Sequence, residues 1–320
     1  MELKNGKYVL EKAKKGGYAV GAFNFSNLEQ LKAILDAANR KKSDVIVQVS
    51  SSAIKYMGLD VIVPMVTALS KNLDIAVCLN LDHGKNFEIV KQCVDAGFTN
   101  VMIDASDLSF DENVKLTKQC VEYAHSKNVS VEAELGSLKG VEDEISSRES
   151  LFTKPEDAKR FVELTGIDSL AISIGTSHGA YKFSGESYLD IERLKQITKL
   201  TDIPLVLHGA SAVSKELKDR FIASGGIIGN ANGVSAQNLI EAVKNGICKV
   251  NVDTDLRIAF TTGIRASLKS SELFNPRTYL QKGMDEIEVE VEKRIDILNT
   301  NKKIWLVIFF CDKYKHKKTQ

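Results

Sequence analysis

Histidines and acidic residues stand at a few separated points of this 320-residue chain, each at or just after the end of a short apolar run. Three of the five histidines are of this kind: His83, His178 and His208. Three converging imidazoles leave an open position on a zinc ion, which is the arrangement of a catalytic site. Four carboxylates stand at matching points and could assist a metal or move protons: Asp82, Asp104, Glu134 and Asp253. These residue types predict a metal-dependent enzyme.

The apolar runs that precede these residues are rich in β-branched side chains and alternate with amphipathic segments. The runs are 19–23, 44–49, 75–81, 100–105, 129–135, 169–174, 204–208 and 247–252. Eight strand–helix alternations predict a single α/β (β/α)8 TIM barrel, in which catalysis occurs at the carboxyl ends of the strands. A doubly wound open sheet is the alternative. It usually has fewer strands and a glycine-rich first turn, and the chain contains no G-x-G-x-x-G motif.

Small residues follow two of the three histidines. Gly179 follows His178, and a short turn after His208 contains Gly209, Ala210 and Ser211. Backbone N–H groups in such turns can bind the oxygens of a phosphate group, although a single glycine is more often just a turn former. Further candidates for binding an anion stand nearby in the sequence: Lys182, Asn251, Thr254 and Arg257.

Composition argues against several other classes of protein. The 43 basic and 42 acidic residues nearly cancel, so we expect neither a nucleic-acid partner nor a membrane partner. No apolar run reaches transmembrane length, and the amino terminus lacks the apolar core of a secretion signal. The five cysteines are scattered and odd in number, which is typical of a cytoplasmic protein with reduced thiols.

Two segments depart from the strand–helix pattern. Residues 136–154 form a long polar insert, which predicts a mobile functional loop within a barrel domain of residues 1–303. Residues 304–320 begin with an apolar run and end with a basic tail. This atypical tail could be a docking strand, an aggregation-prone end or the product of a misread frame.

Seven motifs, in order along residues 5–300, resemble the class II fructose-bisphosphate/tagatose-bisphosphate aldolase family. They are VGAFNFSNLEQ, LNLDHGK, VMIDAS, VEAELGSLKGVEDE, IGTSHGAYKF, LVLHGAS and KVNVDTDLRIAFT. The resemblance implies a lyase of glycolysis and gluconeogenesis that cleaves D-fructose 1,6-bisphosphate into dihydroxyacetone phosphate and glyceraldehyde 3-phosphate. Retro-aldol cleavage leaves an enediolate, whose charge zinc would stabilise as a Lewis acid. A monovalent cation is a further candidate cofactor, and a homodimer or higher homo-oligomer is expected.

The resemblance also implies a role for each matched residue. The zinc ligands would be His83, His178 and His208, with Asp104 and Glu134 at an alternative metal position. Asp82 would be the acid/base for the C4 hydroxyl, and Glu142 on the 136–154 loop would move the proton at C3. The residues that match the dihydroxyacetone phosphate segments are Gly179, Gly209, Ala210, Ser211, Asn251, Asp253 and Thr254. Ser50 and Arg257 would contact the far phosphate, with the arginine lent by a neighbouring subunit.

Other activities remain open from the sequence. The closest alternative is a tagatose 1,6-bisphosphate aldolase, since Asp253 would contact the C4 hydroxyl of one epimer only. A Schiff-base aldolase would use Lys249 as nucleophile; the ordinary interpretation pairs Lys249 with Glu132 or Glu134 inside the barrel. A barrel hydrolase usually begins with an H-x-H pair, which the first run lacks. A non-catalytic barrel would leave the histidines and carboxylates unexplained.

Overall fold

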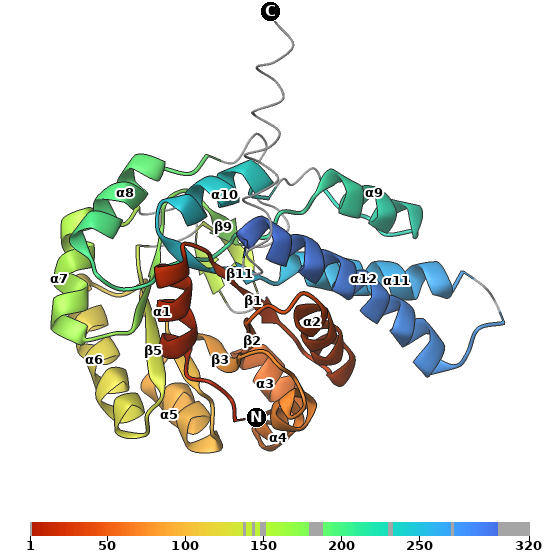
Figure 1. Cartoon of the computed structure of the whole chain (residues 1–320), viewed down its shortest axis with the longest axis horizontal. Helices are drawn as coiled ribbons and strands as arrows, with labels where there is room; N and C mark the ends of the chain where they lie inside the picture. The colour runs from red at the N-terminus through yellow and green to blue at the C-terminus, as the bar shows by residue number, and fades with distance from the viewer. Residues whose placement is uncertain are drawn as a thin grey trace, which may run out of the picture.

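Eight parallel strands form a closed barrel in the computed structural model, which describes residues 2–136, 139–142, 145–147, 152–178, 188–229, 233–269 and 272–299 (Figure 1). The barrel strands are β1 (Val20–Asn24), β2 (Val45–Ser50), β3 (Val77–Gly84), β4 (Asn100–Ile103), β5 (Ser130–Leu135), β8 (Ser169–Ile172), β10 (Leu205–Leu207) and β11 (Ile247–Val252). Each predicted apolar run overlaps one of them. The predicted (β/α)8 barrel is therefore confirmed.

Helices cover the outside of this barrel. They are α1 (Gly6–Gly16), α2 (Leu28–Arg40), α3 (Ser51–Met57), α4 (Leu59–Ser70), α5 (Phe87–Ala96), α6 (Phe110–Ser126), α7 (Pro155–Thr165), α8 (Ile191–Leu200), α9 (Lys215–Ala223), α10 (Ala236–Lys244), α11 (Thr254–Ser267) and α12 (Pro276–Leu298). Apart from α1, their buried faces and the outer faces of the strands form one continuous apolar core. Strand residues are buried on both faces of the sheet, which is consistent with the near-continuous apolar runs in the sequence.

Helix α1 differs from the others because it packs across the amino ends of the strands. Val9, Leu10 and Ala13 of α1 form a separate apolar cluster with residues at the starts of β1 and β3, such as Val20 and Cys78. The helix begins at Asn5, whose side chain accepts a hydrogen bond from the Lys7 backbone N–H at 2.8 Å. It therefore closes the end of the barrel opposite to the carboxyl ends of the strands.

The polar insert contains secondary structure that the sequence pattern did not predict. Strands β6 (Lys139–Glu142) and β7 (Ile145–Ser147) pair antiparallel, and β6 pairs in parallel with β9 (Ser177–His178). His178 follows the sixth barrel strand, β8, and lies on this separate three-stranded sheet. Mobility of the insert stays a prediction, and the tail 304–320 lies outside the described residues.

Glycines with positive φ stand at the ends of two helices. Gly97 is the C-cap of α5 with a φ of 103°. Gly246 follows Asn245, the C-cap of α10, and has a φ of 115°. Within the described ranges no single helix is long and apolar enough to cross a membrane, although α3 and α4 together pass by length and composition with a 90° bend between them.

Candidate active site

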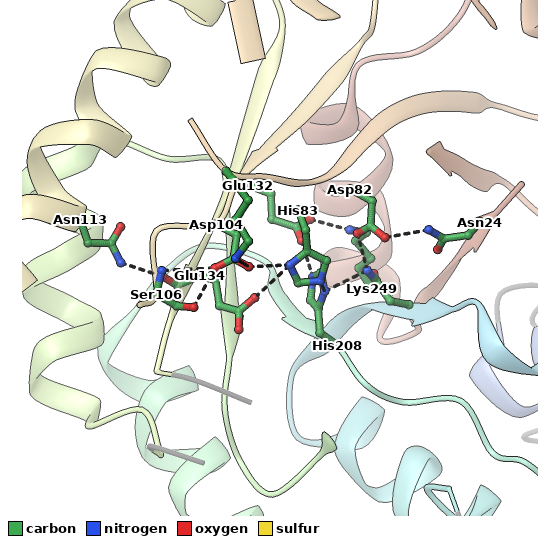
Figure 2. Close-up of polar contacts among 12 residues, drawn as sticks. Asn24, Asp82, His83, Asp104, Ser106, Asn113, Glu132, Glu134, His208 and Lys249 are labelled. Carbon is green, nitrogen blue, oxygen red and sulfur yellow. Dashed lines mark hydrogen bonds and ion pairs between the residues drawn. The ribbon is translucent and has the colours of Figure 1, made fainter. Parts of the chain in front are cut away.

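The predicted chemistry gathers at the carboxyl ends of β3, β4, β5, β10 and β11, where Asp82, His83, Asp104, Glu134 and His208 are all buried (Figure 2). His83 has a φ of 49°, a backbone conformation that non-glycine residues adopt rarely. Such strain persists only where the surrounding structure imposes it, and it clusters at functional sites. The strained residue lies between Asp82 and Gly84, the last residue of β3, at the mouth of the barrel.

One ring nitrogen of His83 is held by a carboxylate. Its Nδ1 lies 2.8 Å from Asp104 Oδ2 and 3.8 Å from Glu134 Oε2. Asp104 also accepts hydrogen bonds from Lys85 Nζ at 2.7 Å and Ser106 Oγ at 2.7 Å. These donors keep Asp104 ionised, so His83 donates its Nδ1–H to it. His83 therefore presents its other ring nitrogen, Nε2, toward His208.

His208 is fixed in the same way by a fully buried ion pair. Its Nε2 lies 2.7 Å from Glu132 Oε1, and the other oxygen of Glu132 accepts a hydrogen bond from Lys249 Nζ at 2.7 Å. Although burial opposes ionisation, Lys249 and His208 lower the pKa of Glu132 to about 2. The ionised Glu132 accepts the Nε2–H of His208. His208 therefore presents Nδ1 toward the centre of the site.

The two imidazoles meet through their remaining nitrogens. His83 Nε2 and His208 Nδ1 are 2.9 Å apart, with the rings edge to face. Burial lowers the pKa of His83, but Asp82, Asp104 and Glu134 raise it to about 9, whereas burial and His83 lower the pKa of His208 to about 4. His83 is then the protonated ring and donates to His208. His83 and His208 are thus residues that would hold a divalent cation, and binding it would require the loss of that proton.

The donor set fits a divalent metal. Side-chain atoms of Asp82, His83 and His208 come within 4.8 Å of one another, as do those of His83, Asp104 and Glu134. Glu134 Oε2 is buried and has no hydrogen-bond partner among the described residues. Burial and the neighbouring Asp104 raise the pKa of Glu134 to about 8. An orphaned carboxylate oxygen beside paired imidazoles is chemically suited to a cation.

Asp82 lies beside the imidazoles and is held by two amides. Asn24 Nδ2 donates to its Oδ2 at 2.8 Å, and Asn251 Nδ2 donates to its Oδ1 at 3.0 Å. The Asn251 amide nitrogen is also 3.0 Å from His208 Nδ1. Each oxygen of Asp82 therefore has one neutral donor. The contacts described here include no lysine or arginine bonded to this carboxylate, which leaves it suited to exchanging a proton.

Hydrogen bonds to the Asp255 carboxylate hold the turn after His208. Asp255 accepts hydrogen bonds from the backbone N–H groups of Ala212 at 2.8 Å and Val213 at 2.7 Å, and it pairs with buried Arg294 at 2.8 Å. Ser211 Oγ accepts the Asp253 backbone N–H at 3.4 Å, which joins this turn to the start of α11. The structure thus brings together the predicted phosphate segments: Gly209, Ala210, Ser211, Asn251, Asp253 and Thr254.

A side cavity of about 250 Å³ adjoins the mouth of the barrel. It is lined by Ser50 and by Asp253 and Arg257, together with residues of β1 and α3. Arg257 makes two contacts with Asp253, Nε to Oδ1 at 2.8 Å and Nη2 to Oδ2 at 2.7 Å. Ser50 and Arg257 of one chain therefore share a cavity. A contribution from a neighbouring subunit stays a prediction.

Four predicted site residues are described only in part or not at all. Gly179 and Lys182 lie outside the described residues, and for His178 and Glu142 only the backbone is described. The ordinary interpretation of Lys249 is confirmed, since it is fully buried and bonded to Glu132.

Asn24, Lys85 and Asp255 were not predicted as site residues, and Glu132 was predicted only as a partner of Lys249. A signal existed for all four, since each stands inside one of the matched motifs: Asn24 in VGAFNFSNLEQ, Lys85 in LNLDHGK, Glu132 in VEAELGSLKGVEDE and Asp255 in KVNVDTDLRIAFT.

Comparison with known proteins agrees with this geometry. The family model for class-II fructose-bisphosphate aldolase matches residues 4–303. The chain is 49% identical to a fructose-bisphosphate aldolase of Giardia intestinalis, over 88% of each chain. It is 46% identical to that of Helicobacter pylori, over 94% of this chain and 100% of the relative. Among solved structures, the YdjI aldolase of Escherichia coli K12 superposes with a TM-score of 0.76 at 27% identity, over 94% of this chain and 99% of the other.

Proposed function

Since the chain belongs to the class-II fructose-bisphosphate aldolase family, we propose that the mouth of its barrel cleaves D-fructose 1,6-bisphosphate reversibly into dihydroxyacetone phosphate and glyceraldehyde 3-phosphate. The protein is an aldolase, a lyase of glycolysis that acts on a phosphorylated sugar. The observation that carries the proposal is the contact between His83 and His208 beside Asp82. A tagatose bisphosphate substrate is not favoured, because the curated relatives are named for the fructose sugar.

The family is generally metal-dependent, and we assign the metal to the paired imidazoles. His83 and His208 would hold Zn²⁺ together with His178, and Asp104 and Glu134 would serve an alternative position. A bound Zn²⁺ supplies Lewis acidity to the oxygens at C2 and C3 of the sugar. Glu132 and Asp104 keep each imidazole in the tautomer that presents a nitrogen to the centre.

The proton steps fall to two carboxylates. Asp82 would take the proton of the C4 hydroxyl while the C3–C4 bond breaks, and it would return the proton during condensation. Asn24 and Asn251 would hold its two oxygens toward the substrate. Glu142, which lies on β6, would deliver and remove the proton at C3, and closure of the insert 136–154 would exclude water.

The two phosphate groups would bind at separate places. Gly179 and the turn from Gly209 to Ser211, with Lys182 nearby and Asn251, Asp253 and Thr254 alongside, would hold the dihydroxyacetone phosphate half. Ser50 and Arg257 would contact the far phosphate in the side cavity. Asp253 would accept a hydrogen bond from the C4 hydroxyl and so favour the fructose epimer.

The remaining proposals concern the whole protein. We expect one domain over residues 1–303 with a separate tail at 304–320, and a homodimer or higher homo-oligomer. The four cysteines described, Cys78, Cys93, Cys120 and Cys248, are unpaired and buried, which supports a cytoplasmic protein. A monovalent cation remains a further candidate cofactor, and the aldolase activity itself calls for no nucleic acid or membrane.

Metal analysis of the purified protein, with cleavage assays on both bisphosphates before and after chelation, tests the function. Chelation should abolish activity and added Zn²⁺ should restore it. His83→Ala should lose metal and activity, whereas Asp82→Ala should keep metal and lose turnover. Near wild-type cleavage by Asp82→Ala would show that the acid/base is misassigned. Borohydride trapping of substrate on Lys249 would instead support a Schiff base.

A further inference from the structure

A row of uncharged polar side chains crosses the barrel interior below Asp82. We call this row the amide ladder; its members are Asn24 of β1, Gln48 of β2, Asn80 of β3, Asn100 of β4 and Ser130 of β5. Each member is the register partner of the next. Asn24 ends β1 whereas Ser130 begins β5, so the ladder descends from the mouth to the amino ends of the strands. Strand tilt in a barrel produces this descent.

All hydrogen bonds of the amide ladder point the same way. Gln48 Nε2 donates to Asn24 Oδ1 at 2.7 Å, and Asn80 Nδ2 donates to Gln48 Oε1 at 3.1 Å. Asn100 Nδ2 donates to Asn80 Oδ1 at 2.7 Å, and the Ser130 hydroxyl donates to Asn100 Oδ1. At the top, Asn24 donates to Asp82. Every link therefore sends an N–H or O–H toward the Asp82 carboxylate.

The upper end of the amide ladder fixes this direction. An ionised carboxylate only accepts hydrogen bonds, so Asn24 must turn its NH₂ group toward Asp82. Its oxygen then faces Gln48, which must donate in turn, and the same holds down to Ser130. At the bottom the Lys7 backbone N–H, at the start of α1, donates to Ser130 Oγ at 3.3 Å. The Ser130 hydroxyl has two acceptors within reach, Asn100 Oδ1 and the Thr99 carbonyl oxygen at 3.3 Å, of which Asn100 Oδ1 is the nearer.

Burying such a row is costly unless every group is paired. Barrel interiors are usually filled by branched apolar side chains, yet the members of the amide ladder are at most 8% exposed. The protein also leaves no space for misalignment at the lower end, since a Cβ on Gly6 would lie 2.3 Å from Asn100 Oδ1. A satisfied row of this kind specifies one arrangement of its side chains.

We infer that Asn80 and Asn100 are positioning residues for the aldol reaction. Although neither bonds to Asp82 directly, they oblige Gln48 to donate to Asn24, and Asn24 then presents an N–H to Asp82 Oδ2. That donor holds the carboxylate in one orientation beside the imidazoles. The inference rests on the proposed role of Asp82 as the group that exchanges the C4 hydroxyl proton.

A single atom exchange at Asn100 tests the direction of the ladder. In the variant Asn100→Asp, an ionised carboxylate still accepts from Ser130 but cannot donate to Asn80. The mismatch passes upward as each amide turns over, until the oxygen of Asn24 faces Asp82. The unfavourable oxygen–oxygen contact costs least between Asn24 and Asp82, because Asp82 lies at the mouth of the barrel and its side chain can rotate away. A protonated carboxyl group at position 100 donates as the amide does and restores the ladder.

The measurement is kcat and KM of Asn100→Asp and of the wild-type holoenzyme between pH 6 and pH 9. Burial raises the pKa of the introduced carboxyl group, so it is protonated at the lower end of this range. The ratio of variant to wild-type kcat should be near one at about pH 6 and fall by about tenfold or more toward pH 9, with KM little changed. A ratio that stays within about twofold throughout would overturn the inference.

Thr99→Val is the matched control. Thr99 precedes Asn100 and its Oγ1 accepts the Leu79 backbone N–H at 3.0 Å, but it is outside the amide ladder. This variant should lose stability while its kcat ratio stays flat with pH; a decline like that of Asn100→Asp would count against the inference. If Asn100→Asp does not fold, Asn80→Asp interrupts the next link, and the same pH-dependent fall is expected.

Asp82→Asn separates the inference from the proposed function. If Asp82→Asn loses turnover while Asn100→Asp and Asn80→Asp give flat ratios, the positioning role is wrong and the proposed function stands. If Asp82→Asn turns over at the wild-type rate, the proposed role of Asp82 fails, and the inference fails with it.

Discussion

Two buried polar systems share the barrel interior, and they differ in charge. The amide ladder follows the arc from β1 to β5 and is neutral throughout. The arc from β5 to β11 contains the ion pair of Glu132 and Lys249, which bonds His208. The first system ends on a carboxylate that must exchange a proton, and the second on an imidazole that must keep one tautomer. Neutral dipoles orient Asp82 without a formal charge, whereas full charges fix His208.

Breaking the charged system should have the largest effect on stability. Lys249→Met leaves Glu132 ionised in a fully buried position, so we expect a loss of about 3–5 kcal/mol in the free energy of unfolding. Urea denaturation of the metal-loaded protein measures this. The double variant Glu132→Gln with Lys249→Met contains no stranded charge and should recover part of the loss. A loss below about 1 kcal/mol for the single variant would contradict this account of the pair.

Neutralising Glu132 alone should weaken metal binding, in addition to the cost of leaving Lys249 buried without its anionic partner. Glu132→Gln weakens the acceptor for the Nε2–H of His208, and we expect metal affinity to fall by about 10- to 100-fold. Competition with a fluorescent zinc indicator measures the affinity. Gln48→Leu breaks the amide ladder without touching an imidazole, so its affinity should match that of the wild type. Equal losses of metal affinity in the two variants would contradict the proposal that Glu132, and not the amide ladder, orients His208 for the metal.

The carboxylates around His83, outside both systems, should make metal binding pH-dependent. The carboxylates around His83 overcome the effect of burial and raise its pKa to about 9, so a cation must displace one proton below that pH. Affinity should therefore rise about tenfold for each pH unit up to about pH 9 and then level off. The amide ladder contributes no titrating group. Indicator titrations from pH 6 to pH 9.5 check the slope, and an affinity independent of pH would refute the assignment.

The smallest effect is expected at the lower end of the barrel. Asn5→Ala removes the amino-terminal cap of α1 and the 2.9 Å hydrogen bond from Asn5 Nδ2 to the Asn128 carbonyl. We expect a loss of about 1 kcal/mol in the free energy of unfolding, with metal affinity unchanged. Thermal denaturation and the indicator titration check both parts. A change in metal affinity would mean that α1 affects the charged system as well.

Periodicity and motifs predicted most of the fold. Parallel strands covered on both faces leave continuous apolar runs, and residues 247–252 coincide with β11. The pairing of β6 with β7 and β9 was missed, because two- to four-residue strands in a polar insert leave no such pattern. His178 follows β8 along the chain, and its place on this small sheet was therefore not predicted.

The site could be predicted only in part. Asp82, His83 and His208 stand at strand ends, so their meeting followed from the barrel. The amide ladder was not predicted, since a lone Gln48 or Asn100 in a strand looks like an ordinary polar residue. Its members come together only through the register of five strands, and register is a property of the closed sheet.

The register of the amide ladder also bears on how the chain selects one barrel among several. Apolar strands can slide past one another by two residues and still present their apolar side chains to the same face. A slip of β3 against its neighbours would leave Asn80 without both Gln48 and Asn100, and each stranded buried amide group costs about 1–3 kcal/mol. Misaligned barrels are therefore less stable than the native one, so the row of carboxamides helps to select the correct strand alignment during folding.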